Sequence, residues 1–344
     1  MTGERMATEV AEQPEVLARL LASAGEIADV AEQVRRTRPR FVLIAARGTS
    51  DHAALYAKYL TEIRLGLPAG LASPSTLTVY GSRPDLTDVL FVAVSQSGGS
   101  PDLVDSTAAA RELGALTVAV TNAADSPLAA ASQLHVDVRA GAELAVAATK
   151  TYTAELLALY LLLSGADASG HAAALPEAAA RTLALNAPDG PGGAAAVAAT
   201  LRDVSRLVVT ARGYSYPTAR EAALKLMETS YLSAQAFSGA DLLHGPLALI
   251  DDTVPVVAIT SPGRGGQAMI PVMDRLRSVD ARVIPVAADG AEHSGLSIAA
   301  DGIAEELLPV LEILPLQQLA WHLAVARGED PDRPRGLSKV TRTW

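Results

Sequence analysis

The stretch Phe41-Val-Leu-Ile-Ala-Ala-Arg-Gly-Thr-Ser50 contains the clearest fold signal in the sequence. It begins with a continuous apolar run and ends in a glycine turn followed by two hydroxyl side chains. An apolar run without polar alternation is typical of a strand that is covered on both faces, as strands in a parallel sheet are. Residues 207–215, Leu-Val-Val-Thr-Ala-Arg-Gly-Tyr-Ser, repeat the pattern 165 residues further along the chain.

Two further strand-like runs repeat at the same offset. Val89–Val94 maps onto Val254–Ile259, and Leu116–Val120 maps onto Ala281–Pro285. A repeat of this length indicates a duplicated domain rather than a solenoid of short units. Because Ala/Leu-rich helical patterns alternate with the apolar runs in each copy, we predict an α/β protein with two tandem doubly wound, flavodoxin-like domains built on parallel sheets.

Breaker residues suggest how the chain is divided. Residues 165–200 are rich in Ala, Gly and Pro, and residues 187–193 mark a loop between the two copies. Residues 327–339 contain too many Gly and Pro residues for regular structure. The predicted segments are an N-terminal helical segment (1–34), the first α/β domain (35–166), a linker with a helix (167–200), the second α/β domain (201–328) and an irregular C-terminal tail (329–344).

The composition excludes several classes of protein. Hydrophobic residues make up 49% and charged residues 19% of the 344 residues, which predicts a globular protein with a large core. A net charge of −10 argues against a nucleic-acid partner, because proteins that bind the phosphate backbone carry clustered Lys and Arg. The chain has no cysteine, which excludes disulfides, thiolate metal ligands and a Cys nucleophile, and fits a cytoplasmic location.

No membrane segment or export signal is predicted. The N-terminal residues run directly into a polar helical pattern rather than an apolar core. The most apolar later stretch, Leu156–Leu163, is far shorter than the ~20 residues that span a bilayer, so we expect a buried helix there.

Hydroxyl-rich loops follow two predicted strands of the first copy. Ser95-Gln-Ser-Gly-Gly-Ser-Pro-Asp102 separates the run Val89–Val94 from a predicted helix over Leu103–Leu113, and Gly48-Thr49-Ser50 follows the first strand. One such loop is explained by helix capping alone. Two of them at the carboxyl edge of one sheet favour a phosphate site, because small residues, hydroxyls and helix N-termini suit a phosphate. The chain has neither a Walker lysine nor a G-x-G-x-x-G after a strand, which argues against nucleoside triphosphates and dinucleotides.

The second copy carries the charged candidates. Glu221, Lys225 and Glu228 are spaced i, i+4 and i+7 on a predicted helix that begins at Pro217, and therefore form one stripe. The spacing alone favours a surface ion-pair stripe worth ~0.3–0.5 kcal/mol per pair. The alternative is a carboxylate held beside an ammonium, which suits the transfer of a carbon-bound proton. His244 precedes Gly-Pro, where a turn leaves its ring free to face a cleft.

These motifs together resemble the sugar isomerase (SIS) family, and within it the isomerase half of glucosamine-6-phosphate synthase (glutamine–fructose-6-phosphate aminotransferase). The resemblance extends from about Phe41 to Lys339. The motifs that carry it are, in chain order, Arg47-Gly-Thr-Ser50, Ser95-Gln-Ser-Gly98, Val146-Ala-Ala-Thr-Lys150, Glu221-Ala-Ala-Leu-Lys-Leu-Met-Glu228, His244-Gly-Pro246 and Arg335-Gly-Leu-Ser-Lys339.

The resemblance implies a role for each matching residue. The residues implied to bind the sugar 6-phosphate are Thr49, Ser50, Ser95, Gln96, Ser97 and Ser100. Glu228 is implied to be the base that moves a proton between C1 and C2, with Lys225 beside it. The implied partner is thus a small-molecule sugar phosphate, and no metal ion or organic cofactor is expected, since no ligand cluster has suitable spacing.

Four further residues complete the implied site. His244 would assist ring opening and, as is typical of the family, reach into the neighbouring subunit, which implies a homodimer with shared active sites. Lys339 would contact the carbonyl end of the sugar from the tail that wraps over it. Val146 and Ser338 would touch the sugar through the backbone or a small side chain.

The sequence also departs from the synthase. Glutamine hydrolysis is not expected, because 40 residues precede the first strand and no cysteine is present, whereas the synthase has an N-terminal glutaminase with a Cys nucleophile. Gly99 and Ser100 stand where the synthase has an acidic residue and Thr. Leu243 replaces a basic residue, and Asp241 replaces Glu. By resemblance, these changes surround the part of the site that handles the amine and the ring oxygen.

Three functions follow as hypotheses. The first is deaminating isomerisation of glucosamine 6-phosphate, or of a related fructosamine phosphate, to a ketose phosphate and ammonia. The second is a lyase that eliminates water from N-acetylglucosamine 6-phosphate. The third is a non-catalytic sugar-phosphate sensor, against which the retained Glu228, His244 and Lys339 argue.

Overall fold

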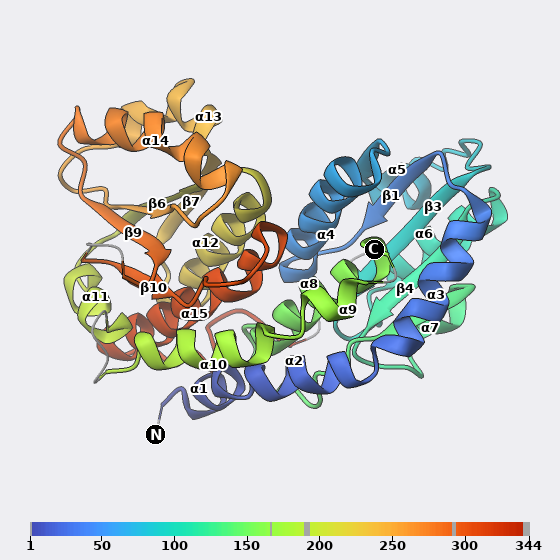
Figure 1. Cartoon of the computed structure of the whole chain (residues 1–344), viewed down its shortest axis with the longest axis horizontal. Coiled ribbons are helices and arrows are strands. Elements are labelled where there is room, and N and C mark those ends of the chain that lie inside the picture. The colour runs from blue at the N-terminus through green and yellow to red at the C-terminus, as the bar shows by residue number, and fades with distance from the viewer. Residues whose placement is uncertain (1, 166, 189–192, 291–293, 340–344) are drawn as a thin grey trace. The chain divides into compact units, whose positions relative to one another are not determined.

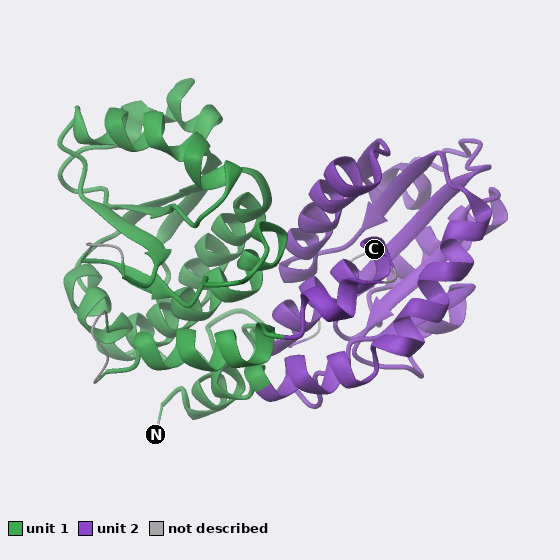
Figure 2. Cartoon of the chain, in the orientation of Figure 1, with its two compact units in different colours: residues 1–14, 144–149, 174–337 green, residues 15–143, 150–173, 338–344 purple. Residues whose placement is uncertain are grey.

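The computed structural model describes the whole chain except residues 1, 166, 189–192, 291–293 and 340–344 (Figure 1). The chain forms two compact units, each assembled from separate stretches of sequence (Figure 2). Unit 1 contains residues 1–14, 144–149 and 174–337, and unit 2 contains residues 15–143, 150–173 and 338–344.

Unit 2 contains a five-stranded parallel sheet in the order β2-β1-β3-β4-β5. Its strands are β1 (Phe41–Ala45), β2 (Ala69–Leu71), β3 (Val89–Ser95), β4 (Leu116–Thr121) and β5 (Leu134–Asp137). Its helices include α3 (Ala24–Thr37), α4 (Thr49–Leu60), α5 (Pro74–Thr78), α6 (Pro101–Glu112), α7 (Pro127–Ala131), α8 (Lys150–Leu163) and α9 (Ala168–His171), while α2 (Gln13–Ala22) begins in unit 1 and continues into unit 2.

Unit 1 contains a second five-stranded parallel sheet in the order β10-β9-β8-β6-β7. Its strands are β6 (Arg206–Ala211), β7 (Ser233–Ser238), β8 (Val256–Ile259), β9 (Val283–Ala288) and β10 (Leu296–Ile298). Its helices include α1 (Glu4–Ala11), α10 (Leu175–Leu185), α11 (Ala194–Leu201), α12 (Tyr216–Ser230), α13 (Gly239–Leu243), α14 (Arg264–Arg277) and α15 (Leu308–Ala326).

The two sheets share one topology, which confirms the predicted fold. With β6 equated to β1 and β7 to β2, both sheets have the doubly wound order 2-1-3-4-5. In both, the strand order reverses between the first and third strands. Ligands of such folds bind at this switch point, beyond the carboxyl ends of the strands.

The register of the sheets supports the predicted offset for two strands and corrects it for the third. Phe41 pairs with Val89 as Val208 pairs with Val256, so the separation of the first and third strands is the same in both copies. Leu90 pairs with Leu116, whereas Val256 pairs with Val283, one residue further on. The predicted match of Leu116–Val120 with Ala281–Pro285 is therefore wrong by one residue, because the segment between β8 and β9 is one residue longer.

Each unit has its own apolar core. In unit 2, Phe91 of β3 packs with Leu103 of α6 and Leu128 of α7. In unit 1, Val256 of β8 packs with Met269 and Leu276 of α14. Fully burying a side chain of this size stabilises a protein by ~1.5–3 kcal/mol, so these clusters fix the helices whose N-termini follow β3 and β8.

The apolar stretch Leu156–Leu163 belongs to α8, in which every residue is buried, as expected for a core helix. Across the described residues, no helix combines the length and apolar character needed to cross a membrane.

The C-terminal tail is irregular, as its breaker residues predict. Residues 327–339 form turns and bends without a helix or strand. Within unit 1, the Asp332 carboxylate accepts hydrogen bonds from the N–H groups of Arg5 (3.0 Å) and Met6 (2.8 Å) in the first turn of α1. This contact ties the beginning of the tail to the N-terminal helix.

Candidate active site

The predicted phosphate loops lie at the switch point of the unit 2 sheet. Thr49 and Ser50 open α4 directly after β1, and residues 95–100 connect β3 to α6. Gly48 and Gly98 have φ values of 57° and 60°, a left-handed conformation that glycine adopts without strain. A Cβ at Gly98 would also collide with the Ser126 hydroxyl. Gly48 and Gly98 are thus required by the backbone itself.

The serine loop is held together by its own hydroxyls. Ser95 Oγ accepts a hydrogen bond from Gly98 N (3.2 Å), and Ser97 Oγ accepts one from Gly99 N (3.3 Å). An ion pair of 2.7 Å between Arg47 and the buried Asp102 links the end of β1 to the first turn of α6. The N-termini of α4 and α6 therefore lie at the same sheet edge, where their amides and dipoles favour an anion.

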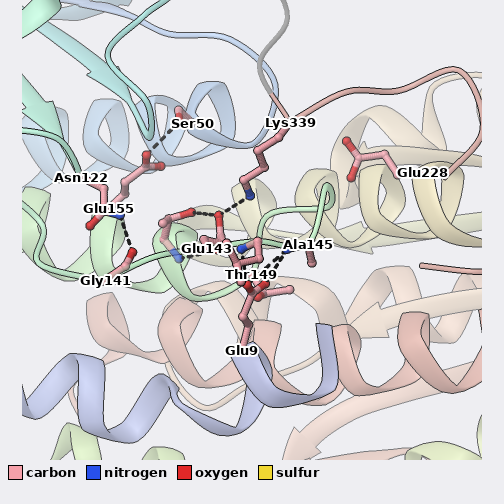
Figure 3. Close-up of polar contacts among 12 residues, drawn as sticks. Glu9, Ser50, Asn122, Gly141, Glu143, Ala145, Thr149, Glu155, Glu228 and Lys339 are labelled. Atoms are coloured by element: carbon pink, nitrogen blue, oxygen red, sulfur yellow. Dashed lines mark hydrogen bonds and ion pairs between the residues drawn. The ribbon is translucent and has the colours of Figure 1, made fainter. Parts of the chain in front are cut away.

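Ser50 has a more specific position than the sequence indicates. Its buried hydroxyl donates a 2.8 Å hydrogen bond to Glu155 of α8 (Figure 3). With that proton committed, Ser50 can offer a phosphate its backbone N–H, which lies in the first turn of α4. Glu155 was not singled out from the sequence, because its partner lies 105 residues away.

Lys339 is paired with a buried acid that sequence reasoning missed. Its Nζ lies 2.8 Å from Glu143 Oε2 (Figure 3). Glu143 also accepts hydrogen bonds from the Thr151 hydroxyl (2.8 Å) and the Thr151 N–H (3.1 Å). A single Glu in an Ala-rich stretch has no spacing pattern that marks it. These contacts fix the direction of the Lys339 side chain within unit 2.

Val146 lies in a segment that is held through its backbone. Within unit 1, the Glu9 carboxylate of α1 accepts hydrogen bonds from the N–H groups of Leu144 and Ala145 (Figure 3). The N–H of Val146 itself donates to the carbonyl of Asp332 in the tail, at 3.4 Å. Glu9 is 4% exposed. The half-buried Val146 is thus presented by a loop with a fixed backbone.

The charged stripe on α12 is buried rather than exposed. Lys225 Nζ lies 3.2 Å from Glu221 Oε1 and 2.6 Å from Glu228 Oε2. The side chains of Glu221 and Lys225 are 0% and 1% exposed, and that of Glu228 is 21% exposed. The surface ion-pair interpretation is therefore wrong for this helix, because α12 packs against β6, β7 and α15.

The burial of Lys225 is compensated by its two neighbours. Desolvation alone would lower the pKa of Lys225, but the charges of Glu221 and Glu228 outweigh it and hold this pKa well above its usual range. Lys225 is thus a permanent ammonium beside Glu228, the member of the trio that retains contact with solvent. A carboxylate in this setting can take up a carbon-bound proton from a substrate that approaches its exposed side.

His244 and Ser338 lie at the surface. His244 caps the C-terminal end of α13, where its N–H donates to the Asp241 carbonyl at 3.0 Å, and its side chain is exposed. Asp241 is engaged at the other end of this short helix, since its N–H and carboxylate both bond the Ser238 hydroxyl. Ser338 is exposed in the tail beside Lys339.

Among the residues that the structure describes, His, Asp and Glu side chains form no cluster of three or more that could hold a metal ion.

Comparison with a family model identifies the two copies. The model for the SIS domain matches residues 37–165 and 200–295. The chain belongs to the SIS-domain family. The first match contains the whole sheet of unit 2, and the second contains the sheet of unit 1 without β10.

Curated SIS-domain relatives are longer proteins. The glutamine–fructose-6-phosphate aminotransferase (isomerizing) of Methanothermobacter thermautotrophicus is 35% identical to this chain. The alignment covers 97% of this chain and 56% of that protein. The aminotransferase of the same name from Symbiobacterium thermophilum is 36% identical over 97% of this chain and 58% of its own length. The chain therefore spans just over half the length of these relatives.

Solved structures of similar chains agree with the family assignment. A candidate phosphosugar isomerase of Silicibacter pomeroyi is 35% identical, with a TM-score of 0.84 over 96% of this chain and all of that chain. The C-terminal domain of glucosamine-fructose-6-phosphate aminotransferase from Francisella tularensis is 26% identical, with a TM-score of 0.85 over 96% of this chain and 98% of that domain. A glucosamine-6-phosphate deaminase of Thermotoga maritima shares the fold at 19% identity, with a TM-score of 0.75 and coverage of 99% of this chain and 100% of that chain.

Proposed function

We propose that this SIS protein is an amino-sugar 6-phosphate enzyme that acts by ring opening and proton abstraction at C2. Its proposed reaction is the deaminating isomerisation of glucosamine 6-phosphate to a ketose phosphate and ammonia. The observation that carries the proposal is the buried Glu221–Lys225–Glu228 trio, in which a partly exposed carboxylate lies 2.6 Å from a permanent ammonium. A binding protein has no need for this arrangement.

The phosphate end of the substrate is assigned to the loops of unit 2. The donors are the amides that open α4 together with the hydroxyls of Thr49, Ser95, Ser97 and Ser100 and the amide of Gln96. A phosphate dianion needs several donors in fixed positions more than it needs a cation, and helix N-termini supply such donors. The loops contact a group that the reaction leaves unchanged, so they contribute binding.

The chemical steps are assigned to three side chains. His244 moves the proton between the anomeric hydroxyl and the ring oxygen that opens the ring to the C1 aldehyde. Glu228 takes the C2 proton while the C1 oxygen is protonated, and the resulting enolamine receives the proton at C1 to give a C2 imine. Water then hydrolyses the imine to the ketose and ammonia. Lys339, held by Glu143, stabilises the developing charge at the C1 oxygen.

The test is to incubate the chain with glucosamine 6-phosphate and to follow ammonia and fructose 6-phosphate together. Equal amounts of both products support the proposal. The Glu228→Gln variant should lose turnover and keep phosphate affinity, because it removes the base and leaves the loops intact. Glu112→Gln, on the exposed end of α6, is the matched control and should behave as wild type. Full activity of Glu228→Gln would exclude Glu228 as the base.

One observation favours a second candidate function. Leu243 is 38% exposed directly before His244, and an apolar surface there suits the methyl group of an N-acetyl substituent. An acylated nitrogen leaves poorly, so removal of the C2 proton from N-acetylglucosamine 6-phosphate would instead expel the C3 hydroxyl as water. A product that is lighter by one water and absorbs in the ultraviolet, without ammonia, would establish this lyase. Binding of both sugars without turnover would establish a sensor.

We also propose that the chain acts as a homodimer in which His244 completes the site of the neighbouring subunit. The exposed position of His244 at the end of α13 supports this assignment, since a surface side chain is accessible to a second copy.

A further inference from the structure

The loop after β8 in unit 1 is the counterpart of the serine loop after β3 in unit 2. β3 and β8 occupy the same place in their sheets. At the offset of the repeat, residues 260–264 correspond to residues 95–99, and both loops lead into a helix, α14 or α6. Gly98 has a φ of 60° and its counterpart Gly263 has a φ of 119°. The loop glycine therefore has a positive φ in both copies.

The second loop already holds an anion, which comes from the chain itself. Glu305 Oε2 accepts a hydrogen bond from Arg264 N (2.9 Å), and Glu305 Oε1 accepts one from Gly265 N (2.7 Å). Both carboxylate oxygens are thus bonded to the first two amides of the 14-residue helix α14. This is the position that a phosphate or carboxylate ligand occupies at a helix N-terminus.

The loop is shaped around this carboxylate. A Cβ at Gly263 would collide with the carboxyl group of Glu305, and a Cβ at Gly265 would lie 2.8 Å from the Arg212 carbonyl oxygen. Glycine at both positions lets the backbone approach the acid closely. In the first copy, by contrast, the amides of Gly98 and Gly99 are bonded by short serine hydroxyls of the loop itself, which can rotate toward a ligand.

A second pair of equivalent contacts shows where the difference between the copies arises. Ser50 donates to Glu155 of α8, and Ser215 donates to Glu312 of α15, at 2.8 Å in both cases. The residue seven positions before the buried glutamate is Glu305 in the second copy and Ala148 in the first. The second copy therefore carries a carboxylate at a position where the first copy has a methyl group.

We propose that Glu305 is a built-in anion that closes the second loop. One chain then binds one sugar phosphate, and the amides of Arg264 and Gly265 form a latent site for an inorganic anion such as phosphate. The assignment of the first loop rests on the proposed function, whereas the closure of the second loop does not. The experiment therefore compares the number of phosphate ions bound per chain between variants and does not depend on turnover.

The test is to count bound inorganic phosphate per chain by calorimetric titration at constant ionic strength. Glu305→Ala should bind one phosphate more than wild type. Glu306→Ala, which removes the same charge from the next residue, should bind the same number as wild type. Combining Glu305→Ala with Ser97→Ala should weaken the first site and retain the additional one. If wild type binds no phosphate while Glu305→Ala binds one, the proposed function fails and the closure stands. No additional phosphate in Glu305→Ala overturns the closure.

Thermal stability supplies a second readout. Glu305→Ala should have a lower Tm than wild type, and phosphate should restore it more than chloride of equal ionic strength does, because a ligand that binds only the native state stabilises it. If Glu305→Ala folds only when phosphate is present, the proposal is supported. Glu305→Gln keeps the size of the side chain without its charge and should have a lowered Tm with no added phosphate site. A wild-type Tm for Glu305→Gln would show that the charge has no part in closing the loop and would overturn the proposal.

Discussion

The ammonium of Lys225 lies 2.6 Å from the carboxylate of Glu228, less than one turn further along α12. Lys225 is also within 3.2 Å of Glu221, and neither of these two side chains has appreciable contact with solvent. A buried ion pair of this kind contributes little net stability, yet removing one partner is costly because it leaves a charge in an apolar environment. The trio therefore couples the proposed chemistry of Glu228 to the folding of unit 1.

Lys225→Met should lower the free energy of unfolding by ~3–5 kcal/mol, because the buried Glu221 would lose the ammonium that lies 3.2 Å from it. Glu228→Gln should lower the free energy of unfolding much less, because Glu228 is partly exposed and Lys225 retains its ion pair with Glu221. Urea denaturation measures both effects. The double variant Lys225→Met/Glu221→Met should recover much of the loss. Equal stability of Lys225→Met and Glu228→Gln would contradict this account.

Stability should fall as the pH rises toward neutrality, because of Glu312. Burial raises the pKa of this carboxyl to about 7, against the smaller opposing effects of the Ser261, Ser215 and Thr218 hydroxyls. Because the folded-state pKa lies above the unfolded value of 4.5, the contribution of Glu312 to the free energy of unfolding is complete below about pH 4.5. It is lost as the pH rises through about 7. The slope for one group is at most ~1.4 kcal/mol per pH unit.

Glu312→Gln removes this titration, so the stability difference between wild type and Glu312→Gln should depend on pH in that window alone. Urea denaturation of both proteins from pH 4 to 9 measures it. A stability difference that does not vary with pH would show that folding leaves the pKa of Glu312 unchanged.

Glu143→Gln should lower kcat and leave the affinity for inorganic phosphate unchanged, since Glu143 fixes the direction of Lys339. A misplacement of a catalytic group by about 1 Å costs on the order of a hundredfold in rate. The test compares Glu143→Gln, Lys339→Ala and the double variant. If Glu143 acts through Lys339, the double variant is no slower than Lys339→Ala. Additive losses would assign Glu143 an independent role.

The tail should detach more easily when its contact with the end of α12 is weakened. The Arg335 guanidinium lies 3.8 Å above the Tyr231 ring, and the Arg335 N–H donates to the Tyr231 hydroxyl at 2.9 Å. The hydrogen bond contributes ~0.5–1.5 kcal/mol, which corresponds to roughly a two- to tenfold change in the open population.

Tyr231→Phe should therefore speed tryptic cleavage after Lys339 by that factor. Tyr80→Phe, on the exposed Tyr80 of unit 2, is the control and should leave the rate unchanged. Identical cleavage of wild type and Tyr231→Phe would show that this contact does not restrain the tail.

Two inactive variants should restore activity when mixed, if the homodimer shares its sites as proposed. Glu228→Gln and His244→Ala inactivate different halves of such a site, so a heterodimer retains one intact site of two. After subunit exchange, about a quarter of the wild-type activity should return, because about half of the dimers are heterodimers. Activity assays of the mixture after mild dissociation measure this. A mixture as inactive as its components would place His244 in the site of its own chain.

The fold could be predicted from the sequence because its strands are buried on both faces. The runs that became β1, β3 and β8 are apolar almost throughout, that of β6 is interrupted by Thr210, and their spacing is preserved between the copies. The third strand was misplaced by one residue, since helix-to-strand connections tolerate an insertion that leaves the apolar pattern intact. The spacing of Glu221, Lys225 and Glu228 predicted a shared helix face, but not that other elements would cover it.

The acids that hold the candidate site together could not be found in the same way. Glu9 and Glu143 each bind a group that is distant in sequence, so no local spacing distinguishes them from solvated residues. Their signal is burial, which follows only from the packed structure. Thr49, Ser95 and Ser97, in contrast, were found because consecutive small and hydroxyl residues after an apolar run are themselves a local pattern.

The pairing of Lys339 with Glu143 has a consequence for the synthesis of the protein. The two residues are separated by 196 positions, and the intervening chain contains the whole second sheet. At translation rates of about 5–20 residues per second, the ribosome needs roughly 10–40 s to travel from one to the other. During that interval the nascent first copy has every strand of its sheet, but Glu143 lacks the Lys339 ammonium with which it pairs. Chains released early would therefore carry a folded sheet with an incomplete charge pair.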